Sequence, residues 1–254
     1  MTDLYFDADM LVYQSCVVNE NPIEWSDGMY TIDCCLEDVI SSFNQRVVKL
    51  KNLVSNYYQL DKVRVFMALT STEYNFRKTI LPTYKGNRSL KRRPLCLMPM
   101  RDYVHKNYTT IEIPHLEADD VIGMYCGDNP NAVMISGDKD FRSIPCRFYD
   151  FSRDEYFDTT QDEAVRWHYI QTLVGDSVDG YVGCPTIGYK RAKRILDENC
   201  TWQAIVDTYK EQGLTEEHAL TQARLAYILR HKEEYNKETG EIKLWKPPTH
   251  LQKQ

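Results

Sequence analysis

The stretch LEADDVIG, from Leu116 to Gly123, places three carboxylates at the start of a predicted helix: Glu117, Asp119 and Asp120. Glu117 and Asp120 stand three positions apart and therefore share one face of that helix. Carboxylates in a first turn gain from the helix dipole, but capping alone does not require three of them. The stretch closely follows Thr110–Ile113, an apolar run that predicts a strand. A helix that begins with acidic residues and follows a strand in the sequence is typical of an α/β fold with a charged site.

Carboxylate pairs occur at three other places in the first 180 residues. They are Asp7 with Asp9, Asp138 with Asp140, and Asp176 with Asp179, the last pair between Gly175 and Gly180. Burying a carboxylate beside a strand end is costly unless the group is paired or holds a metal. An all-oxygen ligand set suits Mg²⁺ or Mn²⁺ rather than zinc. The pattern therefore indicates metal-assisted hydrolysis of phosphodiester bonds, with two ions about 4 Å apart.

Apolar runs predict an α/β core over residues 1–160. The predicted strands are Thr2–Phe6, Lys62–Leu69, Thr110–Ile113 and Ala132–Ile135. Helical spacing predicts helices over Ile32–Tyr58, from near Leu97, and over Leu116–Tyr125. Because strands alternate with helices, we expect a mostly parallel, doubly wound sheet. Asp7, Asp138 and Asp140 then lie outside the carboxyl ends of strands, where such sheets bind ligands.

After Phe157 the pattern becomes helical, which predicts a lobe over residues 161–254. Its predicted helices are Asp162–Val174, Tyr189–Glu198 and Thr215–His231. No clear linker separates core and lobe, so we expect one composite domain. The last ten or so residues, from Pro247 and Pro248, are expected to form a frayed tail.

The charge is unevenly distributed, although the net charge is −6. Eight Lys or Arg and no acidic residue lie between Arg77 and Arg101. A solvated helix face normally mixes both signs, so this basic run predicts phosphate contacts. Lys85 and Arg88 are the candidate cations for the reacting phosphate, and Tyr84 either stacks on an exposed base or packs internally.

A glycine-rich turn, Gly183–Gly188, precedes a second basic cluster made of Lys190, Arg191, Lys193 and Arg194. Glycines let a backbone approach a phosphate closely, and the amides at the start of the next helix face it. The basic side chains extend the contact along a duplex. We therefore predict an element that binds DNA independently of its base sequence.

Other classes of protein fit the composition less well. The chain has no apolar run near the ~20 residues of a membrane helix and no recognisable signal peptide. Its eight cysteines form no CxxC pair, which favours reduced thiols in the cytoplasm, or the host cytoplasm for a viral protein. Four residues offer zinc-binding side chains, although their spacing matches no known pattern of zinc ligands: Cys96, His105, His115 and Cys126.

Six motifs occur together in a fixed order over nearly the whole chain. They are FDAD at Phe6–Asp9, FRK at Phe76–Lys78, YKGNR at Tyr84–Arg88, LEADDVIG at Leu116–Gly123, SGDKDF at Ser136–Phe141, and GDSVDGYVGCPTIGYKRA at Gly175–Ala192. With them the chain resembles the flap endonuclease and 5′→3′ exonuclease superfamily, and within it the exonucleases of T-odd bacteriophages.

The resemblance implies a PIN-like α/β core, a helical arch at about 77–101 and a helix–three-turn–helix motif at about 175–198. The metal ligands it implies are Asp7, Glu117, Asp119, Asp120, Asp138, Asp140, Asp176 and Asp179. Lys85 and Arg88 would contact the scissile phosphate, and the implied DNA contacts are Arg77, Tyr84, Lys190, Arg191 and Lys193. A K⁺ ion would bind backbone carbonyls of the turn, at Val182, Cys184 and Ile187.

The chain departs from the family pattern after its second strand. Relatives commonly carry a metal-binding aspartate there, whereas Leu69–Asn75 contains none. Either Glu73 replaces it, or a water or hydroxyl does. Asp9 is either a further acid of the site or a helix cap.

The function expected from these features is a Mg²⁺-dependent 5′→3′ exonuclease and flap endonuclease. It would act on duplex DNA at 5′ ends, nicks, gaps and flaps during phage replication or recombination, and on RNA primers in RNA–DNA hybrids. A PIN-type ribonuclease shares the core but lacks the turn before Lys190. A catalytically weak protein that binds DNA ends is the other alternative, and only the missing aspartate favours it.

Overall fold

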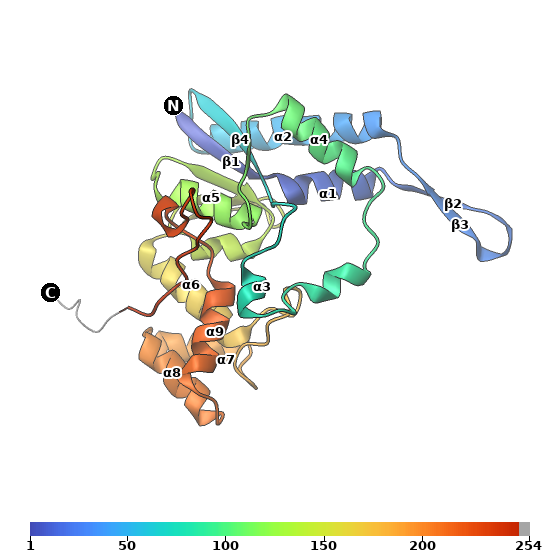
Figure 1. Cartoon of the computed structure of the whole chain (residues 1–254). Helices are drawn as coiled ribbons and strands as arrows, with labels where there is room; N and C mark the ends of the chain where they lie inside the picture. Colours follow the sequence, from blue (N-terminus) through green and yellow to red (C-terminus); the bar gives the residue numbers. More distant parts are fainter. Residues whose placement is uncertain (249–254) are drawn as a thin grey trace.

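The computed structural model describes residues 1–248, apart from the side chains at 89 and 90 (Figure 1). Its centre is a six-stranded sheet in the order β5-β4-β1-β6-β7-β8. The strands are β1 (Thr2–Asp7), β4 (Val63–Leu69), β5 (Thr110–Glu112), β6 (Val133–Ser136), β7 (Arg147–Asp150) and β8 (Glu155–Asp158). All neighbouring pairs are parallel except β7 with β8. The prediction of a mostly parallel α/β sheet is confirmed.

Side chains of β1 alternate between two apolar layers, as the two-residue period of a strand requires. Leu4 and Phe6 face α1 (Ala8–Val18), α2 (Leu36–Tyr57) and α4 (Leu97–Asn107). Tyr5 faces α5 (Ala118–Gly127) and the segment that follows the last helix. The sheet is thus covered on both faces, as parallel sheets are.

The C-terminal lobe packs four helices around its own apolar cluster. They are α6 (Gln161–Val174), α7 (Tyr189–Glu198), α8 (Trp202–Glu211) and α9 (Glu216–Ala226). The predicted helix to His231 was too long, because the chain turns extended at Tyr227 and runs across α5. There the backbone passes so close to Gly123 and Gly127 that an added Cβ would collide with the carbonyls of Leu229 and Arg230.

Several elements were not predicted from the sequence. These are α1, α8, β7, β8 and a two-stranded hairpin of β2 (Asn21–Glu24) and β3 (Tyr30–Asp33), which projects from the body (Figure 1). The predicted helix from Ile32 therefore begins only at Leu36.

The expected arch at 77–101 is helical only in part. It contains α3 (Arg77–Ile80), the 3-10 turn η2 (Gly86–Leu90) and the first residues of α4. Residues 249–254 of the predicted tail lie outside the described part of the chain. No helix among the described residues is both long and apolar enough to cross a bilayer.

Candidate active site

An acidic cluster forms at the carboxyl edge of the sheet, where β1 and β6 end. Asp7 terminates β1, caps α1 by accepting from the Met10 N–H at 3.1 Å, and accepts from the Ser136 hydroxyl at 2.7 Å. Ser136 ends β6, and its hydroxyl also accepts from the Asp138 N–H at 3.1 Å. The serine thereby fixes two predicted site residues relative to each other.

Four carboxyl groups repel one another, and we call them the acidic cluster: Asp7, which is buried, and Asp119, Asp138 and Asp140, which are half-buried. Burial and then Asp9 raise the pKa of Asp7 to about 7, and burial and then Asp138 raise the pKa of Asp140 to about 8. Burial, Asp7 and Asp138 raise the pKa of Asp119 well above its ordinary value, and burial raises the pKa of Asp138. The cluster therefore lacks positive charge that would keep all four groups ionised.

The donor chemistry of the acidic cluster fits a hard divalent cation. All its donors are oxygens, and Oδ1 of Asp140 is buried without a hydrogen-bond partner among the described residues. Within residues 1–248, no three His, Cys, Asp or Glu side chains converge closely enough to enclose an ion. Mg²⁺ suits such an open arrangement, because it binds through one or two carboxylates and keeps several waters.

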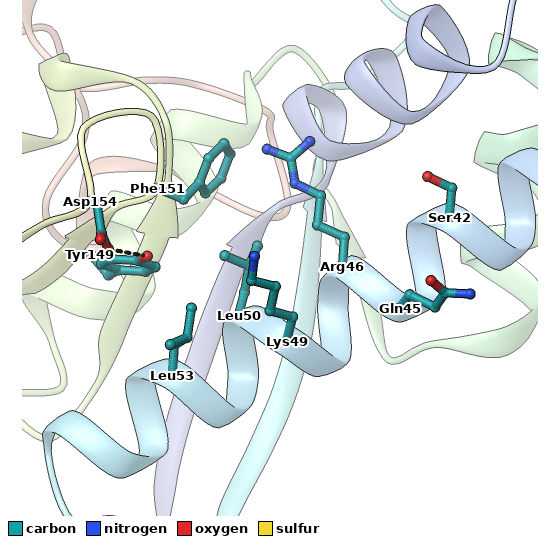
Figure 2. A pocket seen from close by; sticks show the side chains of 9 residues that line it. All are labelled: Ser42, Gln45, Arg46, Lys49, Leu50, Leu53, Tyr149, Phe151 and Asp154. Atoms are coloured by element: carbon teal, nitrogen blue, oxygen red, sulfur yellow. Dashed lines mark hydrogen bonds between the residues drawn. The ribbon is translucent and has the colours of Figure 1, made fainter.

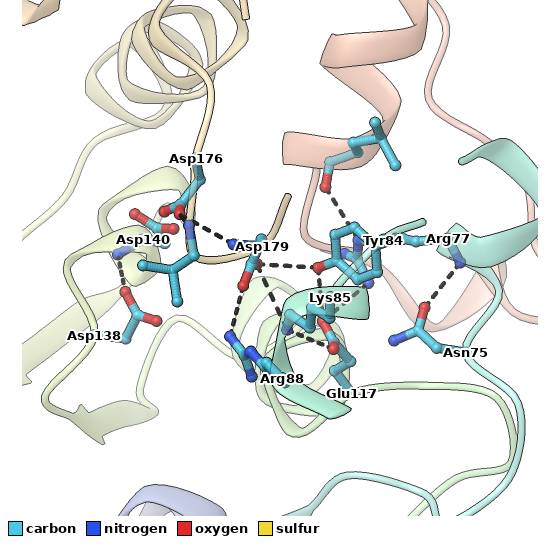
Figure 3. Close-up of polar contacts among 12 residues, drawn as sticks. Asn75, Arg77, Tyr84, Lys85, Arg88, Glu117, Asp138, Asp140, Asp176 and Asp179 are labelled. Carbon is cyan, nitrogen blue, oxygen red and sulfur yellow. Dashed lines mark hydrogen bonds and ion pairs between the residues drawn. The ribbon is translucent and has the colours of Figure 1, made fainter. Parts of the chain in front are cut away.

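A second group, which we call the basic clamp, lies beside the acidic cluster and consists of Tyr84, Lys85 and Arg88 (Figure 3). The Lys85 ammonium donates to Glu117 at 2.5 Å and lies 3.5 Å from Asp179. The Arg88 guanidinium donates to Asp179 at 2.6 Å. Although burial acts to raise the pKa of Glu117, Lys85 and Arg77 lower it, so this carboxylate is ionised.

The backbone of Lys85 is held in the left-handed region at a φ of 54°, which is rare for a residue with a Cβ. Its N–H donates to the Asp179 carbonyl at 2.8 Å. This contact joins the arch segment to the turn that carries Asp176 and Asp179. A strained residue at the centre of the clamp is typical of functional sites.

Arg77 was predicted to contact DNA, and this prediction is wrong. Its side chain is only 2% exposed, and it donates two hydrogen bonds of 2.7 Å to Asp120. It also donates to the carbonyls of Leu225 at 3.1 Å and Tyr227 at 2.6 Å. Arg77 is a structural cation that joins the arch segment and α5 to the lobe.

The same contacts correct the expected role of Asp120 as a metal ligand. Its side chain is fully buried, and both oxygens accept from Arg77. They accept in addition from the N–H groups of Glu117 and Leu229. No lone pair is left facing the acidic cluster, so Asp120 orients the start of α5 instead.

Tyr84 packs internally, and the expectation that it stacks on a base is wrong for this structure. It is 2% exposed, and its hydroxyl lies 3.1 Å from both Glu117 Oε2 and Asp179 Oδ2. The hydroxyl can donate to one carboxylate at a time, and it thereby links the two residues that hold Lys85.

Within the region of the missing aspartate, Thr70 lies against the start of α5, because its hydroxyl accepts from the Ala118 N–H at 3.0 Å, whereas Glu73 lies elsewhere. Glu73 is exposed and lies 3.7 Å from His115, so the structure does not bring it to the site. Asp9 accepts from Arg101 at 2.6 Å and from the Thr70 N–H at 2.7 Å, which makes it a link between α1 and α4. Its expected role as cap falls to Asp7.

The remaining predicted residues lie on the turn and helix that follow α6. Asp176 accepts from the N–H groups of Val178 at 2.7 Å and Asp179 at 3.2 Å, and it lies near Asp140 (Figure 3). Val182 is exposed, whereas Cys184 and Ile187 are buried in the lobe. The exposed side chains of α7 and its start pair with no acid among the described residues: Lys190, Arg191, Lys193 and Arg194.

The raised pKa values predict how stability depends on pH. The folded-state pKa values of Asp7, about 7, and Asp140, about 8, exceed their ordinary value of 3.8. Between about pH 4 and 8 the folded protein therefore binds more protons than the unfolded chain, and the free energy of unfolding falls as pH rises. In EDTA, Tm should fall across this window, and added Mg²⁺ should raise Tm more at about pH 8 than at about pH 5.

Differential scanning calorimetry in EDTA and in Mg²⁺ measures this dependence. Asp140→Asn should flatten the fall of Tm, whereas the control Asp61→Asn, at an exposed site, should not. A Tm that rises with pH in EDTA would contradict the electrostatic description of the acidic cluster.

Comparison with known proteins finds an exonuclease family and phage exonucleases that are similar to this chain. The family described as "5′-3′ exonuclease, N-terminal resolvase-like domain" matches residues 6–165. The chain is 30% identical to an exodeoxyribonuclease of Enterobacteria phage T3, over 96% of this chain and 92% of the relative. It is 29% identical to an exonuclease of Escherichia phage T7, over 96% and 93% of the two chains.

Solved structures show the same fold at lower identity. A T5 5′-exonuclease with bound zinc superposes with a TM-score of 0.63 at 17% identity, covering 89% of each chain. A T5 flap endonuclease in a pseudo-enzyme–product complex with DNA and metal ions gives 0.62 at 17% identity, again over 89% of each chain.

Proposed function

This chain belongs to the 5′-3′ exonuclease family, and from that membership we propose that it hydrolyses phosphodiester bonds at 5′ ends, nicks and flaps of duplex DNA. The observation that carries the proposal is the acidic cluster beside the basic clamp at the carboxyl edge of a parallel sheet. Carboxylates that need cations and cations that can meet a phosphate are the two parts that phosphodiester hydrolysis requires.

Divalent cations, with Mg²⁺ as our specific proposal, would be held by the acidic cluster together with Glu117, Asp176 and Asp179. When bound, they supply a water activated for attack and charge that stabilises the leaving 3′-oxygen. Asp120 is not among the proposed ligands, because Arg77 occupies both of its oxygens.

The chain's own residues then have distinct tasks. Ser136 holds Asp7 in place, and the Tyr84 hydroxyl holds Glu117 and Asp179. Lys85 forms an ion pair with Glu117, and Arg88 forms one with Asp179. A phosphate in the site competes for the two cations, which neutralise its charge during attack.

Duplex DNA would be bound along the turn before α7. The four exposed cations Lys190, Arg191, Lys193 and Arg194 match a phosphate backbone and no particular base sequence. We further propose K⁺ at backbone carbonyls of Val182, Cys184 and Ile187, since carbonyl oxygens are ligands of hard cations and a DNA phosphate beside this turn would offset the charge of the nearby Lys and Arg. This lobe favours the DNA enzyme over a PIN-type ribonuclease.

A nicked duplex tests the function directly. The strand that begins at the nick carries a label at its 5′ or its 3′ end, and it is incubated with Mg²⁺ or with EDTA. We expect short products from the 5′ label in Mg²⁺ only. A parallel duplex with an RNA segment at the nick tests primer removal. Tight binding without cleavage would favour the DNA-end-binding alternative, and products that start from the 3′ end would contradict the polarity.

A further inference from the structure

An open cavity of about 720 Å³ lies between α2 and the turn from β7 to β8, and we call it the α2 cavity (Figure 2). The helix contributes Arg46, Lys49 and Leu53, and the strand side contributes Tyr149, Phe151 and Asp154. None of these residues belongs to the acidic cluster, the basic clamp or the turn before α7. The volume falls within the ~300–1,000 Å³ of small-molecule sites.

Two cations without acidic partners project into this cavity. Arg46 and Lys49 are three positions apart, so both lie on one face of α2. Neither forms an ion pair within the part of the chain that the structure describes, and the Arg46 guanidinium lies 4.9 Å from the centre of the Phe151 ring. Burial lowers the pKa of Arg46, which marks a cation that an anion would stabilise.

The acidic residue of the cavity does not serve as that anion. Asp154 accepts from the Tyr149 hydroxyl at 2.8 Å, and within residues 1–248 no salt bridge joins it to Arg46 or Lys49. The cavity thus has a cationic side on α2 and an oxygen acceptor at the opposite wall (Figure 2).

The α2 cavity adjoins the acidic cluster through Phe151. The Phe151 N–H donates to the Ser136 carbonyl at 3.0 Å. The Phe151 ring lies so close to Gly137 that a Cβ there would be 2.7 Å from it. Gly137 directly precedes Asp138. Cys184 and Ile187 of the turn before α7 pack in the lobe's own apolar cluster, whereas Leu50, Tyr149 and Phe151 of the cavity pack in the cluster on the α1–α2 face of the sheet, so the cavity is separate from that turn.

The geometry points to the α2 cavity as a binding site for one nucleotide unit. Arg46 and Lys49 would hold the phosphate, since guanidinium and ammonium groups together give charge and several donors. The partly exposed Phe151 and Leu53 offer apolar contact to a ring, and Asp154 offers an acceptor to a ring N–H group such as that of thymine.

Such a nucleotide has two sources, which share this chemistry. It is either a free nucleoside 5′-monophosphate released by cleavage or a nucleotide of the substrate strand beside the scissile bond. Both sources rest on the proposed nuclease function, which supplies the strand and the product.

Binding measurements in EDTA distinguish the sources. The ligands are thymidine 5′-monophosphate, thymidine as the control without phosphate, and a single-stranded oligothymidylate. Arg46→Ala and Lys49→Ala should each weaken binding about tenfold. The control Lys51→Ala removes the same charge from the same helix outside the cavity and should leave affinity unchanged. For the oligonucleotide, the salt slope should fall by about 0.7 for each phosphate that the variant no longer neutralises.

Each outcome has one meaning. Weaker binding of the monophosphate assigns the cavity to the free nucleotide, and weaker binding of the oligonucleotide alone assigns it to the strand. Affinities equal to wild type for both ligands in Arg46→Ala overturn the proposal. Arg46→Lys, which keeps the charge, should retain most of the affinity, and circular dichroism checks that every variant is folded.

The nicked-duplex assay on the same preparations keeps the two proposals apart. If wild-type protein cleaves while Arg46→Ala binds both ligands normally, only the α2 cavity is wrong. If wild-type protein does not cleave with Mg²⁺, the nuclease function is wrong, whatever the cavity binds.

Discussion

Replacing Asp138 with asparagine is expected to abolish cleavage of a nicked duplex while leaving DNA affinity unchanged. The amide oxygen can still accept from the Asp140 N–H, which Asp138 Oδ1 now does at 2.9 Å, so the local turn survives and only the charge is lost. Removing one charged ligand of a metal site costs several kcal/mol in the transition state, and a rate loss of about a thousandfold or more follows. The basic residues of α7 are untouched.

Single-turnover cleavage in Mg²⁺ and filter binding in EDTA measure the two effects separately. Glu73→Gln is the matched control, since it removes a carboxylate from the region of the missing aspartate but outside the acidic cluster. It should cleave at the wild-type rate. Near-normal cleavage by the Asp138 variant would contradict the assignment of the acidic cluster as the metal site.

Replacing Arg77 with methionine is expected to lower the free energy of unfolding by about 3–5 kcal/mol. The change leaves the Asp120 carboxylate, which is fully buried, without its two guanidinium hydrogen bonds. It also leaves the carbonyls of Leu225 and Tyr227 without this donor. An uncompensated buried charge is among the costliest defects a fold can carry.

Urea denaturation of Arg77→Met and of Lys78→Met tests this expectation. Lys78 is the exposed neighbour in α3, and its replacement should change the free energy of unfolding by no more than about 0.5 kcal/mol. The double variant Arg77→Met, Asp120→Leu should recover much of the loss, because it removes both charges together. Equal stabilities of the two single variants would show that the buried pair is not required.

The sequence predicted the parts of the structure that depend on local patterns. Apolar runs located four of the six strands, and Asp7 and Asp138 were placed at strand ends because Asp7 directly follows one run and Asp138 comes three positions after another. The hairpin of β2 and β3 was missed because its strands are short and almost wholly exposed, and because Ile32 was assigned to the following helix. The helix α8 was missed although Thr201 before Trp202 is a regular N-cap signal.

Partners that lie far apart in the sequence could not be predicted. Arg77 belongs to a run of eight cations without an acid, and the composition of this run predicted that its side chains contact DNA. Its acid lies 43 positions away, and its carbonyl partners 148 and 150 positions away. Only the folded chain shows that one cation of the run is internal while Lys85 and Arg88 face the site.

Gly123 and Gly127 of α5 pack against the backbone of Leu229 and Arg230, and this contact implies that the enzyme folds in a defined order during its synthesis. Leu229 follows Gly127 by about a hundred residues, which take roughly 5–20 s to synthesise at ~5–20 residues per second. Until that segment leaves the ribosome, the carbonyls that pack on Gly123 and Gly127 are missing, and Arg77 lacks two of its acceptors. The helix that carries Glu117 and Asp119 is therefore fixed only after residues 225–230 have been synthesised, and a growing chain does not become a nuclease before its C-terminal lobe exists.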